Sequence, residues 1–429
     1  MLAPQSITNI AASLAVMQPK IKAALYGMYI GDALAMPVHW YYDTSRIKKD
    51  FGSGGIQKYE ASVKNFPGSI MNLSNTGGGG RGSDKDSIVG EIILHDKKKY
   101  WLRGGSYHYH HGMKPGENTL DTLIARVMLK TLLYLESGAE KSSNEATSSI
   151  GRDIVSQYYN GKENECSKKT KVDINPFTET FLDDYIQYMT TPDSHNDVYA
   201  ATAHRMFFAN YANKKDKFVC ADNDGHNTDS VDGVINILIM SLNEIVVRAR
   251  RLKVSDHSPN SIDVSVSSEK NQPMKKLLYD SINVIRQSED LPIYGVVYHN
   301  LIAKLIVEQK ELRQAIIEII EENPDIFRGL TKERLEKYSK TAPSADPMSA
   351  CYVSSNFPVT LMLAYKYAHS LEQALLASAN AGGENVNRNA LLGGIMGAST
   401  GMTPEIERLV DGLVLKENIM AEVEQFSKL

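Results

Sequence analysis

The residues best suited to chemistry lie in a polar turn near the end of the sequence, Gly382–Arg388, which reads GGENVNR. Helical patterns flank the turn, so its side chains stand at the start of a helix. Glu384 supplies a carboxylate, Asn385 and Asn387 supply amides, and Arg388 supplies a cation. A helix N-terminus attracts anions through its free backbone N–H groups, which favours a phosphate site with Arg388 as charge partner. The alternative is ordinary helix capping.

A second candidate segment is GDALAMPVH, which contains Asp32 and His39. Asp32 lies in an otherwise apolar helical stretch, where burying a carboxylate is costly unless it is paired or binds a metal. Both residues are therefore candidates for ligand binding. The alternative is that Asp32 accepts hydrogen bonds from the amides of a neighbouring loop.

The third segment, GENTLDT, stands at the start of another apolar helix and contains Asn118, Thr119 and Asp121. The plainer reading makes Asn118 the N-cap and places Asp121 at the third helical position, where a carboxylate suits the helix dipole. The functional reading directs the oxygens of Thr119, Asp121 and Thr122 at a ligand hydroxyl or at a hard cation such as Mg²⁺.

The fourth segment, DNDGHNTDS at residues 222–230, partly matches a calcium-binding loop. The glutamate that such a loop needs six residues after its glycine is replaced by Val231, so this reading fails. A capped helix start is the alternative, and His226 remains a candidate for substrate binding. The nearby residues 194–197 (SHND) and 204–205 (HR) add polar groups whose orientation the sequence does not show.

Three histidines lie close together in the sequence YHYHH, at His108, His110 and His111. On a strand, His108 and His110 would share one face. Zinc needs further ligands, and no other residue stands at a recognisable spacing, so a metal site is not favoured. Whether these side chains reach a ligand cleft is left open.

Helical periodicity dominates the elements that must position these residues. We predict helices over 20–36, 118–137, 228–251, 275–288, 297–322, 331–339, 359–378, 387–398 and 404–425. Ala23, Gly27 and Gly31, spaced by four in the first, and Gly393, Gly394 and Gly397 near the end predict close helix packing. Residues 88–109 are predicted to form a β-hairpin. Residues 51–87, 138–170 and 254–272 are predicted to be loops or irregular insertions.

The predicted architecture is therefore one all-α domain over residues 1–429, with a core of about 21–400 and a small hairpin excursion. The chain is 42% hydrophobic with a net charge of −4, which argues against nucleic acid or an anionic membrane as its main partner. Its three cysteines are widely spaced, as expected of free thiols in a reducing compartment. No signal peptide or membrane-spanning run is recognisable, so a cytoplasmic protein is expected. The oligomeric state is left open.

Taken in order, these segments resemble the ADP-ribosylglycohydrolase family. The motifs GDALAMPVHWYY, KPGENTLDT, SHND, ACYVSSNFP and GGENVNR are most similar in pattern to the branch that contains the jellyfish lens J-crystallins. The resemblance runs from about residue 21 to residue 400. It implies a single orthogonal helical domain in which two Mg²⁺ ions position ADP-ribose and a water molecule that cleaves an N- or O-glycosidic bond.

Compared with the family motifs, this sequence has lost metal ligands. The family's Thr-Asp-Asp-Thr run falls on residues 119–122, where Leu120 replaces one aspartate. Its Asp-x-Asp-Thr turn falls on residues 384–387, where Glu384, Val386 and Asn387 replace the two aspartates and the threonine. The acidic residue that follows the family's first helix falls near His39.

Two kinds of site remain compatible with these residues. One is a single magnesium site made by Thr119, Asp121 and Glu384. The other is a metal-free cleft in which Asn and His side chains bind sugar hydroxyls and Asp121 or Glu384 acts as general base; its residues are Asp32, His39, Asn118, Asp121, Glu384, Asn385 and Asn387. The corresponding functions are a hydrolase of ADP-ribosyl or other ribosyl glycosides, a non-catalytic crystallin-like or ligand-binding protein, and a hydrolase with an altered N-glycoside or amide substrate.

Overall fold

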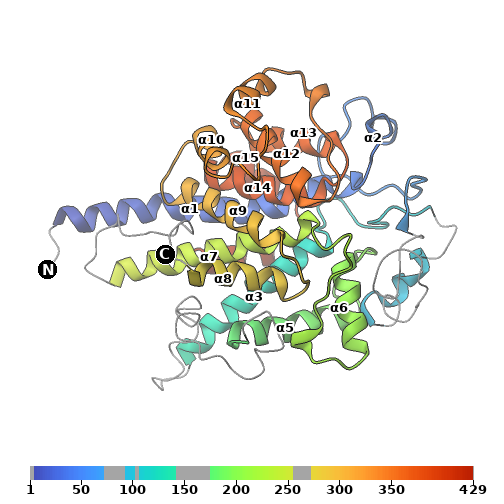
Figure 1. Ribbon diagram of the computed structural model, residues 1–429, viewed down its shortest axis with the longest axis horizontal. Coiled ribbons are helices and arrows are strands. Elements are labelled where there is room, and N and C mark those ends of the chain that lie inside the picture. The colour runs from blue at the N-terminus through green and yellow to red at the C-terminus, as the bar shows by residue number, and fades with distance from the viewer. Residues whose placement is uncertain (1–3, 72–91, 102–105, 142–173, 255–271, 429) are drawn as a thin grey trace.

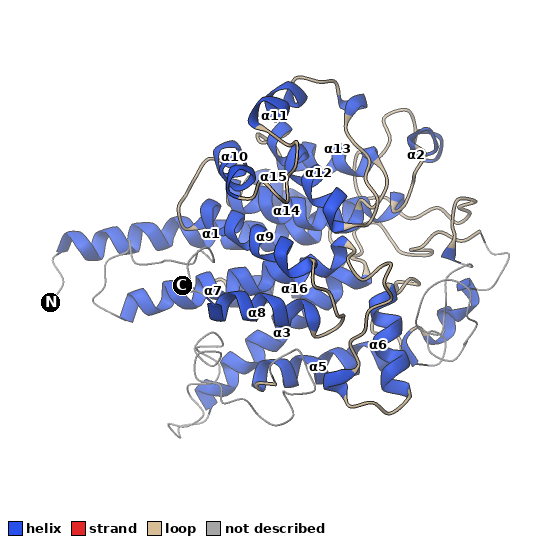
Figure 2. Ribbon diagram, in the orientation of Figure 1, coloured by secondary structure: helices blue, strands red, loops and turns tan. Residues whose placement is uncertain are grey.

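The computed structural model describes residues 4–71, 92–101, 106–141, 174–254 and 272–428. Within these ranges the chain forms helices joined by turns and loops, and its only β-pairings are isolated bridges between single residues. Figure 2 shows this absence of strands in the described part of the chain. The all-α prediction is confirmed.

The helices follow one another along the chain as α1 (Pro4–Ala35), α2 (Thr44–Phe51), α3 (Leu120–Lys141), α5 (Pro176–Thr190), α6 (Thr202–Ala212), α7 (Ile235–Val254), α8 (Gln272–Asn283), α9 (Leu291–Ile306), α10 (Leu312–Glu322), α11 (Lys332–Ser339), α12 (Val353–Lys366), α13 (Leu371–Ala381), α14 (Val386–Thr400), α15 (Pro404–Val410) and α16 (Lys416–Phe426). In Figure 1, α1, α9 and α14 run through the middle of the molecule, with α10 to α13 on one side. On the other side lie α7 and α8, followed by α3 and α5. Two of these central helices, α1 and α14, therefore come from near opposite ends of the chain.

The pairing of α1 with α14 brings two helix backbones into direct contact. A Cβ atom added at Gly27 would lie 2.0 Å from the carbonyl oxygen of Gly393, and one added at Gly31 would lie 2.1 Å from that of Asn389. A Cβ at Gly397 would lie 2.0 Å from the carbonyl oxygen of Ala23. Only glycine permits this approach, so the close packing predicted from the small residues spaced by four is confirmed.

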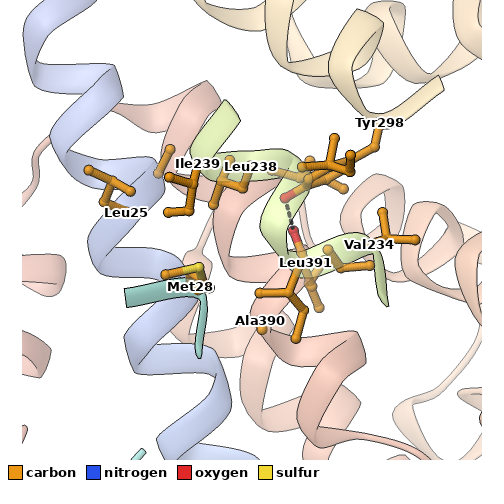
Figure 3. Packing of buried hydrophobic residues seen from close by; sticks show 14 of the residues in the cluster. Leu25, Met28, Val234, Leu238, Ile239, Tyr298, Ala390 and Leu391 are labelled. Atoms are coloured by element: carbon orange, nitrogen blue, oxygen red, sulfur yellow. Dashed lines mark hydrogen bonds between the residues drawn. The ribbon is translucent and has the colours of Figure 1, made fainter. Parts of the chain in front are cut away.

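The opposite face of α14 packs against α7 and α9. Figure 3 shows the Tyr298 hydroxyl directed at Leu391 of α14. A Cβ added at Gly394 of α14 would lie 2.5 Å from that hydroxyl and 2.9 Å from the Leu238 side chain of α7. That hydroxyl donates a hydrogen bond to the Leu391 carbonyl at 3.1 Å, and Tyr298 itself is fully buried. Helix α14 is therefore held on two sides, which fixes the position of the polar turn at its start.

Several predicted boundaries were wrong. The predicted hairpin at 88–109 is not formed where the structure describes it, because His95–Trp101 is a 3-10 helix and residues 106–109 are loop. The predicted helices over 297–322, 359–378 and 404–425 each divide into two at a short turn. Helix α3 continues past Gly138, and α2, α5 and α6 were not predicted. Short amphipathic helices carry weaker periodicity than long buried ones, and tertiary packing stabilises them.

Most of the two predicted insertions, residues 142–170 and 255–271, lie outside the described residues. Among the helices that are described, none combines the length and apolar character needed to cross a bilayer.

Candidate active site

The four polar segments singled out in the sequence meet at a cavity of about 250 Å³. Its walls come from parts of the chain that are far apart in sequence: His39, Trp40, Tyr42, Ile70, Tyr109, Asp121, Tyr199, Ala201, Thr202, Arg205, His226, Asn227, Ser230, Asp232, residues 350–352, Glu384 and Asn387. Of the predicted site residues, His39, Asp121, His226, Glu384 and Asn387 line this cavity, whereas Asp32, Asn118, Thr119, Asn385 and Arg388 lie behind its wall.

The turn that places Glu384 on this wall depends on two glycines. Gly382 and Gly383 have φ angles of +75° and +74°, a region that residues with a Cβ rarely adopt. A Cβ on Gly383 would also lie 2.2 Å from the Ser349 carbonyl oxygen. The Gly383 N–H donates to the Tyr41 carbonyl at 2.8 Å, and the Glu384 N–H donates to the Ser349 carbonyl at 2.9 Å. The backbone around Glu384 is therefore clamped between the segment after α1 and the segment before α12.

Glu384 begins a continuous chain of buried hydrogen-bonding groups. The His39 ring places Nε2 at 3.0 and 2.9 Å from the two carboxylate oxygens of Glu384, and its Nδ1 lies 2.6 Å from His110 Nε2. His110 Nδ1 then lies 2.8 Å from Asp197 Oδ1. Each of these four side chains is at most 2% exposed. The Glu384–His39–His110–Asp197 chain thus runs from the cavity wall into the protein.

Asp121 forms a second carboxylate on the same wall. Its Oδ1 lies 3.2 Å from His204 Nε2, and His204 Nδ1 is held at 2.8 Å by the Tyr185 hydroxyl. The Asn387 side-chain amide lies 3.4 Å from Asp121 Oδ2 and 3.2 Å from Glu384 Oε1. One amide nitrogen therefore contacts both predicted catalytic carboxylates. The side-chain Oδ1 of Asn387 is buried and has no hydrogen-bond partner.

The N-terminus of α3 explains why Asp32, Asn118 and Thr119 lie outside the cavity. Asp32 accepts hydrogen bonds from the Asn118 amide, the Thr119 N–H and the Thr119 hydroxyl, at 2.8, 2.8 and 2.5 Å. The next N–H, that of Leu120, donates to Asp197 Oδ2 at 2.8 Å. Carboxylates from two other segments therefore satisfy the free N–H groups at the start of this helix. Burial raises the pKa of Asp32 to about 6, against the opposing effect of these hydrogen bonds.

This arrangement corrects the predicted roles of two residues. The first helical residue is Leu120, so Asn118 is not the N-cap and Asp121 stands at the second helical position. The alternative reading of Asp32, as an acceptor for the amides of a neighbouring loop, is the one that the structure shows.

Arg388 and Asn385 hold the turn from behind. Arg388 is fully buried and donates to the Ser378 hydroxyl and carbonyl, the Ser349 hydroxyl and the Gly382 carbonyl. Burial lowers the pKa of this guanidinium to about 10. The Asn385 amide donates to the Val38 and Ala379 carbonyls. Arg388 therefore stabilises the end of α13 instead of contributing to an anion site in the cavity.

The fourth segment, residues 222–230, forms hydrogen bonds within itself, and its second half contributes to the cavity wall. Asp224 Oδ1 accepts hydrogen bonds from the N–H groups of His226, Asn227 and Thr228, and Oδ2 accepts one from the Asn227 side-chain amide, so both oxygens are already used. His226 is exposed and lies at the rim, with its ring nitrogens 3.2 and 3.4 Å from the Tyr352 hydroxyl.

Asp232 contributes a third carboxylate to the lining and forms a buried ion pair with Arg286. This pair holds the pKa of Asp232 below its usual value, although burial acts in the opposite direction. Asp232 is therefore a charged wall residue whose counter-ion is already in place.

An aromatic cluster forms another part of the wall. The Trp40 ring meets the rings of Tyr109 and Tyr199 edge to face, at centroid distances of 4.4 and 5.0 Å. Trp40 has a φ of +58°, which is uncommon for a residue with a bulky side chain. Such strain is often found at binding sites, where the surroundings hold an unfavourable conformation in place.

Arg205 is a buried cation beside this cluster. It is 3% exposed, and its guanidinium lies 5.1 Å from the Trp101 ring centroid. It donates to the Ala200 carbonyl and the Thr202 hydroxyl, while its buried Nε has no acceptor. No carboxylate among the described residues forms an ion pair with it. A buried positive charge on a cavity wall, without a counter-ion in that part of the protein, is suited to an anionic ligand.

Sequence reasoning missed the roles of His110, Asp197, His204 and Arg205. The polar segments SHND and HR stood out among apolar neighbours, but nothing in the sequence showed where they point. Of the three clustered histidines, only His110 connects to the cavity, through His39. His108 accepts a hydrogen bond from the His110 N–H, and burial holds its pKa well below the usual range.

The donor set does not fit the two-magnesium arrangement that the resemblance implies. Leu120 and Val386 stand where the family has aspartates, and both are buried in the hydrophobic core. The Thr119 hydroxyl is directed at Asp32, not at the cavity, and both oxygens of Glu384 contact His39. No group of three His, Cys, Asp or Glu side chains in the described part of the chain is arranged to hold a metal ion.

Comparison with known proteins identifies the family. The pattern that defines the ADP-ribosylglycohydrolase family matches residues 14–428, and the chain belongs to that family. None of the curated proteins compared with it matches significantly. One solved structure, described as an ADP-ribosylglycohydrolase-related protein complex, is 14% identical over 96% of this chain and 98% of that chain, with a TM-score of 0.45.

Proposed function

We propose that this protein hydrolyses a ribosyl glycosidic bond in the cavity, with ADP-ribosyl compounds as its substrate class. The observation that carries this proposal is the pair of carboxylates, Asp121 and Glu384, that contact the amide of Asn387 on one wall. The family to which the chain belongs supports the substrate class.

The surroundings of the two carboxylates suggest different roles. Cleavage of a glycosidic bond needs an acid to protonate the leaving group and a base to activate water or to stabilise the sugar cation. Glu384 is 2% exposed and bonded to an imidazole that can supply a proton, which suits the acid. Asp121 is 14% exposed and held by His204, which suits the base. The unpaired side-chain Oδ1 of Asn387 is placed to accept a hydrogen bond from a ribose hydroxyl.

The rest of the cavity suits the remainder of an ADP-ribosyl ligand. Arg205 supplies positive charge for a phosphate group, since guanidinium groups bind phosphate oxygens strongly. Trp40, Tyr109 and Tyr199 supply aromatic surface for the apolar faces of sugar or base rings. A cavity of about 250 Å³ lies just below the usual range for small-molecule sites. We therefore place the ribosyl end inside and let the rest extend past His226 at the rim.

The proposal is tested with the variants Asp121→Asn and Glu384→Gln. Release of ADP-ribose from N- and O-linked ADP-ribosyl substrates is expected to fall by about 10²- to 10⁴-fold, the usual contribution of a general acid or base. Asp96→Asn is the matched control, because that carboxylate is 69% exposed and outside the cavity. Circular dichroism checks that each variant folds. Unchanged turnover in both cavity variants would show that the site assignment is wrong.

A second candidate function, non-catalytic ligand binding or a crystallin-like structural role, is favoured by one observation. Leu120 and Val386, which replace family carboxylates, are fully packed into the core. This alternative expects ADP-ribose to bind without any turnover. Release of ADP-ribose above a heat-inactivated control would exclude it, and a wider panel of N-glycosides and amides would identify an altered substrate.

A further inference from the structure

We propose that the Glu384–His39–His110–Asp197 chain is a proton relay that performs the acid step without a metal ion. The inference rests on the proposed function, because it names the groups that supply a proton to Glu384. His39 and Glu384 line the cavity, whereas His110 and Asp197 do not. His110 and Asp197 are therefore positioning residues, which act on the substrate only through His39 and Glu384.

The number of hydrogen-bond contacts determines how many protons the Glu384–His39–His110–Asp197 chain holds. Three contacts of 2.6 to 2.9 Å join two carboxyl groups and two imidazole rings. Each contact needs one hydrogen, so the chain holds three. Two neutral imidazoles beside two carboxylates would supply only two, and the 2.6 Å contact between His39 and His110 would then join two acceptors. The chain therefore holds one proton more than two neutral histidines carry.

This extra proton takes the place of the missing cations. A buried carboxylate such as Glu384 needs a compensating positive charge, and in a two-metal site the ions would supply it. Here an imidazolium shared between His39 and His110 supplies one positive charge against the charges of Glu384 and Asp197. The substitution of His39 for a family acid and of apolar residues for two others fits this exchange.

At the inner end of the Glu384–His39–His110–Asp197 chain, the Asp197 carboxylate stays ionised. Asp197 also accepts hydrogen bonds from the Leu120 and Tyr199 N–H groups at 2.8 and 3.0 Å, which stabilise its ionised form. Burial would raise the pKa of Asp197, but His110 and these donors hold it below its usual value. Burial would lower the pKa of His110, but the charge of Asp197 raises it. Because Asp197 stays ionised, the mobile proton can move only toward Glu384.

The proposed step moves two protons by one position each. At rest, His110 is protonated on both ring nitrogens and His39 on Nε2. The His39 Nε2 proton passes to Glu384, and the His110 Nε2 proton passes to His39 Nδ1, which leaves both imidazoles neutral. Glu384 gives its proton to the leaving oxygen or nitrogen as the glycosidic bond breaks and the electron pair goes with that atom. Asp121 takes a proton from the attacking water as the new C–O bond forms, and solvent returns that proton to the relay.

Leaving-group dependence separates this role from a structural one. An alkyl or amine leaving group needs the proton, whereas 4-nitrophenolate leaves without it. In Asp197→Asn and His110→Gln we expect turnover of an alkyl- or amine-linked ADP-ribosyl substrate to fall at least about 10²-fold. Turnover of the 4-nitrophenyl analogue should fall less than about tenfold, because no general acid is required. The control His111→Gln, in the same loop but outside the relay and the cavity, should leave both rates unchanged. Equal losses on both substrates would overturn the relay.

A spectroscopic measurement decides the question independently of turnover. Proton and ¹⁵N NMR of the histidine rings should show one imidazolium that persists above the ordinary titration range of histidine. It should also show a strongly downfield N–H proton that is lost in His110→Gln and kept in His111→Gln. Two neutral rings at neutral pH in the wild-type protein would overturn the relay. If the NMR signature is present and no substrate turns over, the proposed hydrolysis is wrong and the charged chain stands as a binding element.

Discussion

At the scale of single residues, Asp121 and Glu384 differ in the side chains that surround them. Both are carboxylates beside the same amide nitrogen of Asn387, yet one faces His204 and the other His39. In water the two side chains would have nearly the same acidity. Different burial and different imidazole partners support the proposed assignment of Glu384 as the acid and Asp121 as the base.

Arg205 is expected to contribute to phosphate binding specifically. In Arg205→Met, calorimetry should show ADP-ribose binding about 10- to 100-fold more weakly, because a hydrogen bond to a charged group contributes about 1.5–3 kcal/mol. Adenosine, which has no phosphate, should bind both proteins equally. Arg46→Met, which removes a surface arginine paired with Asp50, is the control. Equal weakening of both ligands would mean that Arg205 serves the fold and not the anion.

His195 should make the protein sensitive to acid. Burial lowers its pKa to about 4, below the 6.5 of an unfolded histidine. As pH falls below 6.5, the unfolded chain takes up a proton that the folded protein excludes, so stability falls until about pH 4. The loss at pH 5 should be on the order of 2 kcal/mol.

Denaturant unfolding of wild type and His195→Gln at pH 7 and pH 5 measures this effect. The wild-type protein should lose more stability between the two values than the variant does. The same loss in both proteins would show that other groups cause the acid sensitivity.

At the scale of elements, the α1–α14 crossing and the N-terminus of α3 set the geometry of the site. Glycines let α1 and α14 touch backbone to backbone, which brings the turn at Glu384 beside the segment after α1. The start of α3 is fixed by the side chains of Asp32 and Asp197 instead of by its own cap. Each of these helix ends is therefore positioned by a partner that is remote in sequence.

Gly27→Ala should be strongly destabilising although alanine favours helices. The propensity gain of about 1 kcal/mol is outweighed by a Cβ that meets the Gly393 backbone, since overpacking costs about 1–3 kcal/mol or more. The control is Gly295→Ala in α9, where the new Cβ would meet the ends of the Ile237 and Ile282 side chains at 3.2 and 3.3 Å.

Thermal and denaturant unfolding of the two variants provide the comparison. Gly295→Ala should change stability little, because a side-chain end can shift where a backbone cannot. Equal stability of the two variants would contradict the backbone contact between α1 and α14.

At the scale of the whole molecule, the cavity exists because both ends and the middle of the chain meet. Its lining combines residues that follow α1, the start of α3, the start of α6 and the turn before α14. The family assignment covers nearly the same span, residues 14–428. The prediction that the chain is a single domain is compatible with this arrangement and stays a prediction.

Ligand binding to the intact protein should not depend on magnesium. Calorimetric titration of ADP-ribose should give the same affinity with Mg²⁺ and with a chelator, because the cavity lacks a set of oxygen ligands of the kind that this ion requires. ADP-ribose should also raise the unfolding temperature equally in both conditions. Binding that appears only with magnesium would show that Asp121 and Glu384 hold an ion after all.

The sequence by itself determined the helical class, the family and the polar segments that carry chemistry. Periodicity and small residues spaced by four identify buried helices and their close packing, because these properties depend on neighbours along the chain. The replacement of carboxylates by Leu120 and Val386 can likewise be read directly from the sequence. This local information predicted that a family-like two-metal site would be incomplete.

Only the tertiary structure decided which polar residues face the cavity. Asp32, Asn118 and Arg388 were predicted to bind a ligand, but their hydrogen bonds are made to other parts of the protein. Nothing in the sequence paired His110 with Asp197, yet both join His39 to form a buried chain of hydrogen-bonding groups. A side chain's partner depends on contacts between segments that are tens to hundreds of residues apart. No spacing along the chain records those contacts, so the fold alone distinguishes a carboxylate that caps a helix from one that lines the cavity.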